Sequence, residues 1–410
     1  MLARNFTACH LKLGRSCSAS RTCRHSLQLD LTLYHLMFSR GGVLRRYTHL
    51  NELRWTLRPA ERCNSTASSP KVIFSGIQPT GVPHLGNYLG ALRQWVRLQD
   101  EAPPSSTLIY SLVDLHAITV RQHPAQLRQW RRESLAMLLA IGLGPERSII
   151  FHQSDASAHS ELMWILSCRA STGYLGRMTQ WKDKTANEKE GSERMSLGLF
   201  SYPVLQAADI LVHGATHVPV GHDQAQHLEF TRQLANGFNN DYASPGSRIL
   251  VPPETLVSPA KRIMSLTDPT AKMSKSAANP KSRILLTDSE SEIRRKVMAA
   301  VTDSIEGISY DPNRRPGVSN LVELLYHTRD GSDSGTLDEL ADQLRNVSMR
   351  ALKEQVARSV ELAIKPIREH YEAISQDQRM LDEVAMSGAA KARESASLVL
   401  QRVKEAVGLA

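Results

Sequence analysis

Residues 71–88 read Lys-Val-Ile-Phe-Ser-Gly-Ile-Gln-Pro-Thr-Gly-Val-Pro-His-Leu-Gly-Asn-Tyr and predict a strand, a turn and a helix in succession. The run 71–75 is β-branched and aromatic, which is typical of a short buried strand. Glycine and proline punctuate 76–81, so the chain is expected to turn there. Apolar residues then recur at helical spacing over 88–98. The stretch therefore predicts the first strand and the first helix of an α/β fold.

Strand and helix patterns keep alternating after this stretch. Strands are expected at 108–113, 148–153 and 216–219, and helices at 124–141, 158–168 and 205–211. This alternation predicts a doubly wound parallel sheet, in which ligands bind at the carboxyl ends of the strands. Polar residues stand at those ends here, at 75–78, 114–116 and 152–153.

From about residue 267 onward the strand patterns disappear. Helices are predicted at 292–301, 320–327, 336–346, 349–370 and 380–407. We therefore expect a second, helical domain after the α/β domain. The predicted division is a leader at 1–68, a nucleotide-binding domain at 70–266, a helical domain at 267–374 and a C-terminal helix at 375–410 that packs back on the nucleotide-binding domain.

The net charge of +9 is concentrated at the N-terminus. Residues 1–70 hold 11 Lys or Arg and 3 acids, which leaves 39 bases and 38 acids for the rest of the 410-residue chain. The net charge of residues 71–410 is therefore close to zero, and any RNA-binding surface formed by these residues must be a local patch. No apolar run is long enough for a membrane span, so no membrane association is expected.

The first 29 residues contain five bases, no acid and several Ser and Thr. As a helix, the start of this stretch would be amphipathic, with Arg4, Lys12 and Arg15 opposite an apolar side formed by Leu2, Phe6, Cys9 and Leu13. An Arg-rich, acid-poor N-terminus is typical of an organelle transit peptide. This composition predicts that the protein is located in the mitochondrial matrix, with the plastid as the alternative location. A disordered basic tail or an RNA-binding arm would have the same composition.

Cysteine and histidine positions give neither a disulfide framework nor a metal site. Only Cys168, of five cysteines, lies beyond the presumed leader. His222, Asp223 and His227 lack the ligand spacing of a catalytic zinc site. No protein-bound metal is expected.

Two short segments have the composition of a phosphate-binding site. In 272–276, Lys-Met-Ser-Lys-Ser, two lysines could hold a polyphosphate, although lysine-rich pentamers are also common on solvated surfaces. In 83–87, Pro-His-Leu-Gly-Asn, His84 and Asn87 stand at the start of a helix, where backbone N–H groups attract anions. Gly86 would allow a close approach of the backbone to a ligand.

Two more segments offer hydrogen-bonding groups to a ligand. Val-Pro-Val-Gly-His-Asp-Gln at 218–224 follows the fourth strand, and its acid and amide could accept from hydroxyl or ammonium groups. Tyr202, Gln206 and Asp209 share one helical face because of their i, i+4, i+7 spacing. An unpaired buried carboxylate is costly, so Asp209 is expected to meet a donor on the ligand.

The segments 83–87 and 272–276, in this order and at this distance, resemble the two ATP-handling loops of class I aminoacyl-tRNA synthetases. Gly-Ile-Gln-Pro-Thr-Gly at 76–81, Asp-Leu-His-Ala-Ile-Thr at 114–119 and the Met of the lysine pentamer resemble the tryptophanyl branch of that family. The resemblance covers about residues 71–410. His222 departs from it, because Glu is usual there, and so does Ala277, where Asp is usual.

The resemblance implies a Rossmann-like catalytic domain, a helical anticodon-binding domain and a homodimer. It also implies ATP-dependent ligation of L-tryptophan to tRNA(Trp) through a tryptophanyl-adenylate, with Mg²⁺ arriving as part of the ATP complex. Catalysis of phosphate chemistry would fall to Lys272, Lys275, Gln78, His84 and Asn87. ATP would be bound by Gln78, Pro79, Thr80, His84, Gly86, Asn87, Gly221, His222, Asp223, Ile263, Lys272, Met273, Ser274, Lys275 and Ser276. Tryptophan would be bound by Asp209, Tyr202, Gln224, Gln206, His116, Phe74 and Val113.

Within this scheme Asp209 would accept the indole N–H, which can only donate. Three alternatives remain. The Tyr202, Gln206 and Asp209 face also resembles tyrosyl-tRNA synthetases. A nucleotidyltransferase would share the first loop but would be shorter, and a synthetase-derived RNA-binding factor would be expected to lose residues of the ATP loops, which are kept here.

Overall fold

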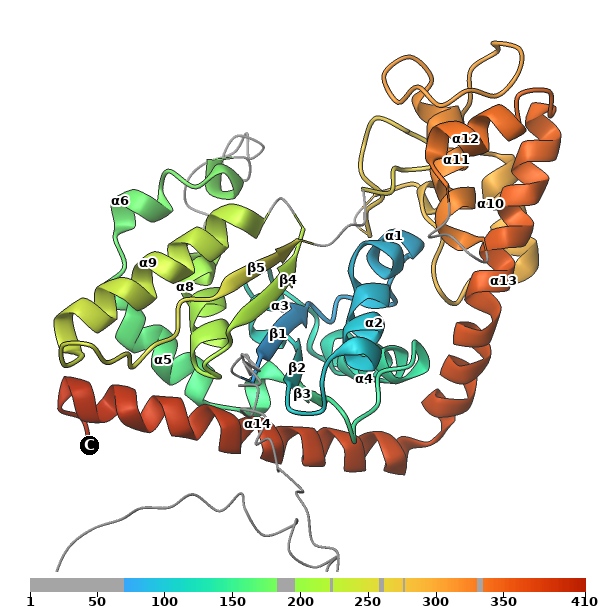
Figure 1. Ribbon diagram of the computed structural model, residues 1–410. Coiled ribbons are helices and arrows are strands. Elements are labelled where there is room, and N and C mark those ends of the chain that lie inside the picture. The colour runs from blue at the N-terminus through green and yellow to red at the C-terminus, as the bar shows by residue number, and fades with distance from the viewer. Residues whose placement is uncertain (1–69, 183–195, 222–223, 258–261, 276, 330–334) are drawn as a thin grey trace, which may run out of the picture. The chain divides into compact units, whose positions relative to one another are not determined.

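The computed structural model describes residues 70–182, 196–221, 224–257, 262–275, 277–329 and 335–410 (Figure 1). Five parallel strands in these ranges form one sheet in the order β3-β2-β1-β4-β5. They are β1 Val72–Ile77, β2 Thr107–Leu112, β3 Ile149–His152, β4 His217–Val220 and β5 Glu254–Val257. The predicted parallel α/β fold is confirmed. Of these five strands only β5 was not predicted, because four residues after two prolines are too short for a periodic signal.

β1 lies at the centre of the sheet, and the direction of chain progression changes beside it. β1 pairs with β2 on one side, with Ile77 opposite Leu112, and with β4 on the other, with Ile73 opposite His217. The chain first builds outward through β2 and β3 and then crosses back to place β4 on the opposite side of β1. Such a switch point leaves a crevice at the carboxyl ends of the strands, which is the usual place for a ligand in an open α/β sheet.

The helix after β1 starts earlier than its apolar spacing predicted. It runs without a break through α1 Leu85–Asn87, the π-helical turn η1 Tyr88–Leu92 and α2 Arg93–Glu101. His84 caps it, because its side chain accepts from the Asn87 N–H while the Asn87 side chain accepts from the His84 N–H. The side-chain cap therefore sets the start of the helix, three residues before the expected one.

The other helices of the first part of the chain connect the strands and cover the sheet. Helix α8 is longer than the predicted 205–211, because it continues through Pro203 back to a cap at Ser196. The helices are α3 Asp114–Ala117, α4 Pro124–Ala140, α5 Ala158–Ser167, α6 Thr172–Leu175, α8 Leu197–Leu211 and α9 Ala225–Tyr242.

Helices dominate the chain after β5. The predicted helical patterns appear as α10 Glu290–Met298, α11 Pro316–Thr328, α12 Leu337–Gln343, α13 Met349–Gln376 and α14 Gln378–Val407. Helices α10 and α11 both pack on α13, which also contacts α4. Their buried side chains, among them Ile293, Leu321 and Val360, belong to the same apolar cluster as Ile73 and Leu112 of the sheet. None of the described helices is long and apolar enough to cross a membrane.

The C-terminal helix α14 packs on β3 and α5 (Figure 1). Its approach to the sheet depends on Gly388, because a β-carbon at this position would lie 1.8 Å from the Ile150 carbonyl oxygen. Buried alanines at 389, 392 and 396 continue the same side of the helix. Small residues therefore fix the distance and the register of α14 against the sheet.

Candidate active site

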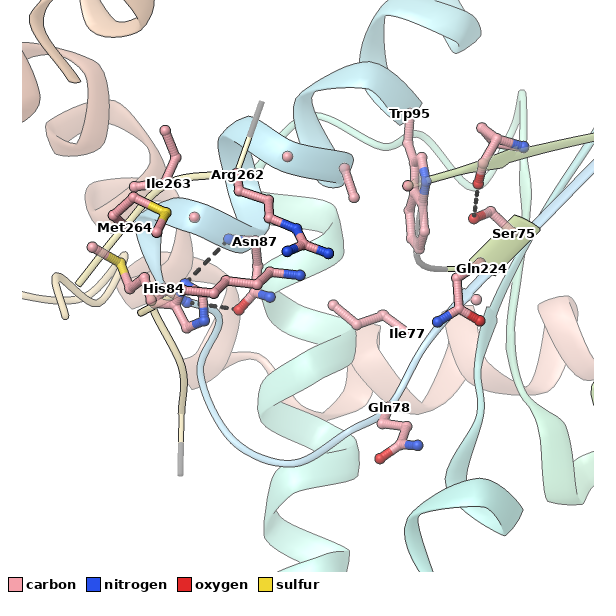
Figure 2. A pocket seen from close by; sticks show the side chains of 18 of the residues that line it. Ser75, Ile77, Gln78, His84, Asn87, Trp95, Gln224, Arg262, Ile263 and Met264 are labelled. Atoms are coloured by element: carbon pink, nitrogen blue, oxygen red, sulfur yellow. Dashed lines mark hydrogen bonds between the residues drawn. The ribbon is translucent and has the colours of Figure 1, made fainter. Parts of the chain in front are cut away.

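A cavity of about 960 Å³ opens at the carboxyl ends of β1 and β4, at the switch point of the sheet. Strand ends, the start of α1, helix α8 and the segment 262–273 all contribute to its wall. Figure 2 shows His84, Asn87, Arg262, Ile263 and Met264 gathered on one side and Ser75, Trp95 and Gln224 on the other. The cavity therefore has two ends of different composition.

Most of the residues predicted from the sequence line this one cavity. They are Phe74, Gln78, His84, Gly86, Asn87, Val113, His116, Tyr202, Gln206, Asp209, Gly221, Gln224, Ile263, Lys272 and Met273. Four predicted residues are not among the lining residues: Pro79, Thr80, Ser274 and Lys275. The predicted His222, Asp223 and Ser276 lie outside the described residues.

His84 presents a defined donor at one end of the cavity. Burial, together with the charges of Lys275, Lys272 and Arg283, lowers the pKa of His84 to about 3, so its ring is neutral. The Nδ1 atom accepts from the Asn87 N–H at 3.2 Å, which leaves the ring proton on Nε2. A β-carbon at Gly86 would come within 3.1 Å of the His84 ring. The absence of a β-carbon at Gly86 thus leaves room for the His84 ring. This ring can donate a hydrogen bond without carrying a charge.

The lysine loop is pinned to the neighbouring segment by its backbone. Lys272 forms an antiparallel bridge with Met264, and the Met273 N–H donates to the Ile263 carbonyl at 3.0 Å. Met273 is buried. The Lys272 side chain thus reaches the cavity from a fixed backbone, beside Ile263.

Lys275 is held differently from Lys272. Its Nζ donates to the Gly81 carbonyl at 2.7 Å, which ties the lysine loop to the turn after β1. Burial lowers the pKa of Lys275 to about 8. To reach a phosphate, the Lys275 ammonium must leave the Gly81 carbonyl and bind an anionic oxygen instead. The negative charge of that oxygen would raise the pKa of Lys275 again, so that the side chain stays charged at higher pH.

Asp209 lies at the other end of the cavity and is 1% exposed. Its Oδ1 accepts from Gln153 Nε2 at 2.6 Å and from His159 Nδ1 at 2.8 Å, and its Oδ2 lies 2.8 Å from His116 Nε2. Burial alone would raise the pKa of Asp209, but the hydrogen bonds from His116 and His159 hold it well below its usual range. The carboxylate is therefore ionised.

The argument that burial of Asp209 calls for a donor on the ligand does not hold. Three side chains pair with this carboxylate, so burial by itself does not require a ligand donor. Each carboxylate oxygen has two acceptor sites, and Oδ2 has one partner among the described residues. One acceptor site thus remains on the carboxylate of a cavity-lining residue.

Tyr202 and the glutamines beside it form a second polar group in the cavity. The Tyr202 hydroxyl donates to Gln180 Oε1 at 2.7 Å and lies 3.2 Å from His227 Nε2. Burial raises the pKa of Tyr202 to about 12, so the hydroxyl keeps its proton. Gln206 Nε2 donates to Gln224 Oε1 at 3.3 Å. These groups are oriented before any ligand arrives.

Several residues in the cavity wall, or buried directly behind it, were not predicted as site residues. Gln153 and His159 bind Asp209, and Gln180 binds Tyr202. Gln153 was marked as a strand-end residue, and that was the one signal available for it. Helix α11 also contributes Ser319, Asn320 and Glu323 to the wall, and its Asn320 Nδ2 donates to the Met264 carbonyl at 3.1 Å.

Within the described part of the chain, no group of three or more His, Cys, Asp or Glu side chains could hold a metal ion. The charged side chains that line the cavity are Arg262 and Lys272 at one end, the Asp209 carboxylate at the other, and Glu323 of α11, whose Oε1 accepts from the Tyr310 hydroxyl. This arrangement can bind a polyphosphate at one end and a hydrogen-bond donor at the other.

Known protein families and solved structures are similar to this chain. The family of class I tRNA synthetases for W and Y matches residues 66–365. The chain belongs to this family. Among its relatives in the class I synthetases are the mitochondrial tryptophan–tRNA ligase of Schizosaccharomyces pombe, 44% identical over 350 residues (82% of this chain and 95% of the relative), and tryptophan–tRNA ligase 2 of Streptomyces avermitilis, 45% identical over 343 residues (83% and 98%).

Solved structures of class I synthetases are also similar to this chain. The tryptophanyl-tRNA synthetase of Mycoplasma pneumoniae has a TM-score of 0.74 at 31% identity and covers 83% of this chain and 98% of its own. That of Campylobacter jejuni, in complex with ADP and tryptophan, has a TM-score of 0.68 at 32% identity, with 82% and 100% covered. The predicted class I tryptophanyl-tRNA synthetase is confirmed.

Proposed function

We propose that this chain ligates L-tryptophan to tRNA(Trp) in two ATP-dependent steps and serves organellar protein synthesis. The observation that carries the proposal is one cavity that has the Lys272 and Arg262 side chains at one end and the buried Asp209 carboxylate at the other. The first end suits a nucleotide triphosphate. The second suits a side chain whose only polar group is a donor, and the indole N–H of tryptophan is such a group.

In the first step a carboxylate oxygen of tryptophan attacks the α-phosphorus of ATP. The bond from the α-phosphorus to its bridging oxygen breaks, and pyrophosphate leaves with its electrons. No protein nucleophile is needed, so catalysis consists of positioning the reactants and stabilising the leaving charge. We assign the charge stabilisation to Lys272 and Lys275, with the neutral His84 donating from Nε2 and with Gln78 and Asn87 assisting. Mg²⁺ enters as part of the ATP substrate.

In the second step a hydroxyl of the terminal ribose of tRNA(Trp) attacks the carbonyl carbon of the adenylate. The mixed anhydride bond breaks, AMP leaves, and the aminoacyl ester forms. Gly221, His222, Asp223 and Ile263 would seat the nucleotide. We propose that the helical domain at 267–374 is the anticodon-binding domain and that its side chains recognise the tRNA. We also propose that the protein is a homodimer.

Tryptophan recognition is assigned to the end of the cavity that holds Asp209. The remaining acceptor site of Asp209 would take the indole N–H, and Phe74, Val113 and His116 would flank the ring. Tyr202, Gln206 and Gln224 would hold the amino group. A site built around a buried hydrogen bond rejects analogues that lack the donor by roughly 10⁴-fold.

The substrate assignment is tested by ATP–pyrophosphate exchange with each of the twenty amino acids. Exchange with tryptophan and a background rate with the other nineteen is the expected result. Exchange with tyrosine at a comparable rate would move the chain to the tyrosyl branch. Exchange with none would favour an RNA-binding factor without synthetase activity.

The mitochondrial assignment rests on the acid-free, Arg-containing N-terminus and on the similarity to a mitochondrial relative, alongside bacterial relatives of equal identity. Residues 1–69 fused to a fluorescent protein should direct it to the mitochondrial matrix. A fusion in which Arg4, Lys12 and Arg15 are replaced by Glu should remain outside. Plastid delivery, or identical distributions of the two fusions, would contradict the assignment.

A further inference from the structure

Two histidines lie behind Asp209 and link it to the C-terminal helix. His159 on α5 is completely buried, and His213, in the turn after α8, is 5% exposed. His159 Nδ1 lies 2.8 Å from Asp209 Oδ1, and His159 Nε2 lies 3.2 Å from His213 Nε2. His213 Nδ1 lies 3.0 Å from the Ser395 hydroxyl on α14. A continuous series of hydrogen bonds thus joins α14 to the carboxylate.

The proton positions in this series follow from its carboxylate end. An ionised carboxylate can only accept, so His159 Nδ1 must donate to Asp209. The contact between His159 Nε2 and His213 Nε2 needs one donor and one acceptor, and a single proton placed on His159 Nδ1 leaves its Nε2 as the acceptor. Burial lowers the pKa of His213 well below its usual value, so the His213 ring is neutral. With one proton on each ring, His213 donates from Nε2 and accepts at Nδ1 from the Ser395 hydroxyl, and each contact has one donor and one acceptor.

Apolar rings enclose the two histidines. Phe74 stacks on His213 with centroids 5.7 Å apart, and Phe151 contacts both histidines at 5.5 and 5.8 Å. Phe74 also lines the cavity. Because aromatic rings offer no strong acceptor, Ser395 and His159 are the hydrogen-bond partners of His213 among the described residues.

Ser395 is held in place by the docking of α14. Gly388 seats the helix against the Ile150 carbonyl. Arg393 Nε donates to the Asp155 carbonyl at 2.6 Å, and Lys404 Nζ pairs with Glu161 of α5 at 2.8 Å. The hydroxyl that ends the series is therefore fixed relative to the sheet and to α5.

We propose that His213 and Ser395 are positioning residues for tryptophan recognition, through which the C-terminal helix sets the proton position on His159 and thereby the orientation of the Asp209 carboxylate. This proposal rests on the proposed role of Asp209 as acceptor of the indole N–H. Without the His213 donor, His159 can move its proton to Nε2, and Nδ1 would then turn a lone pair toward Oδ1. The carboxylate would be repelled from the position that suits the indole.

The test compares tryptophan with 3-benzothienylalanine, in which sulfur replaces the indole N–H. The kcat/KM of ATP–pyrophosphate exchange is measured for both substrates in the full chain. His213→Phe keeps a ring beside Phe74 and removes both nitrogens, and we expect the preference for tryptophan to fall about tenfold. His213→Gln returns an amide donor near the position of Nε2 and should restore most of the preference.

Ser395→Ala removes the last donor and should lower the preference by about threefold, because it leaves a buried acceptor unpaired. Ser397→Ala is the matched control, since this exposed serine lies on the same helix and its hydroxyl donates to the Glu394 carbonyl of its own helix. The control should keep the wild-type preference.

Equal losses of kcat/KM for both substrates in His213→Phe and Ser395→Ala would overturn the proposal, because the histidines would then support only the fold. If His213→Phe does not fold, the preference of Ser395→Ala decides in the same way. A wild-type preference that Asp209→Ala abolishes and that His213→Phe and Ser395→Ala both retain would overturn this proposal alone. A wild-type enzyme without any preference would overturn the role of Asp209 as well.

Discussion

The two ends of the cavity are built on different principles. At the phosphate end, Lys275 is held by one hydrogen bond to the Gly81 carbonyl, across 194 residues of sequence, and both partners lie in loops. At the tryptophan end, the Asp209 carboxylate is held by three side chains that come from separate helices and from the end of a strand. One end is able to exchange partners during a reaction, and the other is fixed before the ligand arrives. The comparison assigns charge movement to the first end and selectivity to the second.

The largest effect is expected at the fixed end. Asp209→Ala removes the acceptor and leaves Gln153, His159 and His116 without their common partner, so the tryptophan KM should rise by roughly 10³-fold or more. The ATP KM should change by less than about threefold, because the two ends share no side chain. Steady-state ATP–pyrophosphate exchange measures both constants. An unchanged tryptophan KM would remove Asp209 from recognition.

At the exchangeable end, Lys275→Ala should lower the kcat of exchange by roughly 10²-fold, because one group that stabilises the leaving charge is lost. The tryptophan KM should stay near the wild-type value. Lys281→Ala, an exposed lysine shortly after the loop, serves as the control and should be neutral. A selective loss of tryptophan binding in Lys275→Ala would contradict the division between the two ends.

The pKa of Lys275 gives a pH dependence to the same end. Burial lowers this pKa to about 8, and a lysine loses its charge as the pH rises. The kcat/KM for ATP should therefore fall above pH 8. One pH unit above this pKa, only about a tenth of the Lys275 side chains are still protonated. Lys275→Arg keeps its charge over this range and should flatten the profile. The same fall in both proteins would assign the titration to another group.

The smallest effect is expected for Gln206. Its amide donates to Gln224 at 3.3 Å, and both side chains are partly exposed to the cavity. Gln206→Ala should raise the tryptophan KM by about threefold, as the loss of one neutral hydrogen bond does. A rise comparable to that of Asp209→Ala would place Gln206 in direct contact with the indole ring.

The same contrast explains how much could be predicted from the sequence. His84, Gly86 and Asn87 form a cap within four residues, so a local motif was sufficient to find them. Tyr202, Gln206 and Asp209 share a helical face, and helical spacing brought them together. The alternation of strands and helices gave the parallel sheet, and polar strand ends marked its functional edge.

Contacts between distant elements could not be predicted in this way. Neither spacing nor composition indicates that Gln153, His159 and His116 converge on Asp209, since they come from three different segments. The inference from the burial of Asp209 to a donor on the ligand failed for that reason. Likewise, the bond between Lys275 and Gly81 depends on how the lysine loop folds back over the turn after β1, which a single sequence does not state.

The most direct test of two separable ends is equilibrium binding of each substrate alone, measured by isothermal titration calorimetry. The Lys272→Ala/Lys275→Ala double variant should bind tryptophan with wild-type affinity and lose affinity for ATP. Asp209→Ala should show the reverse pattern. Loss of both affinities in either folded variant would contradict a cavity whose phosphate end and tryptophan end are independently built.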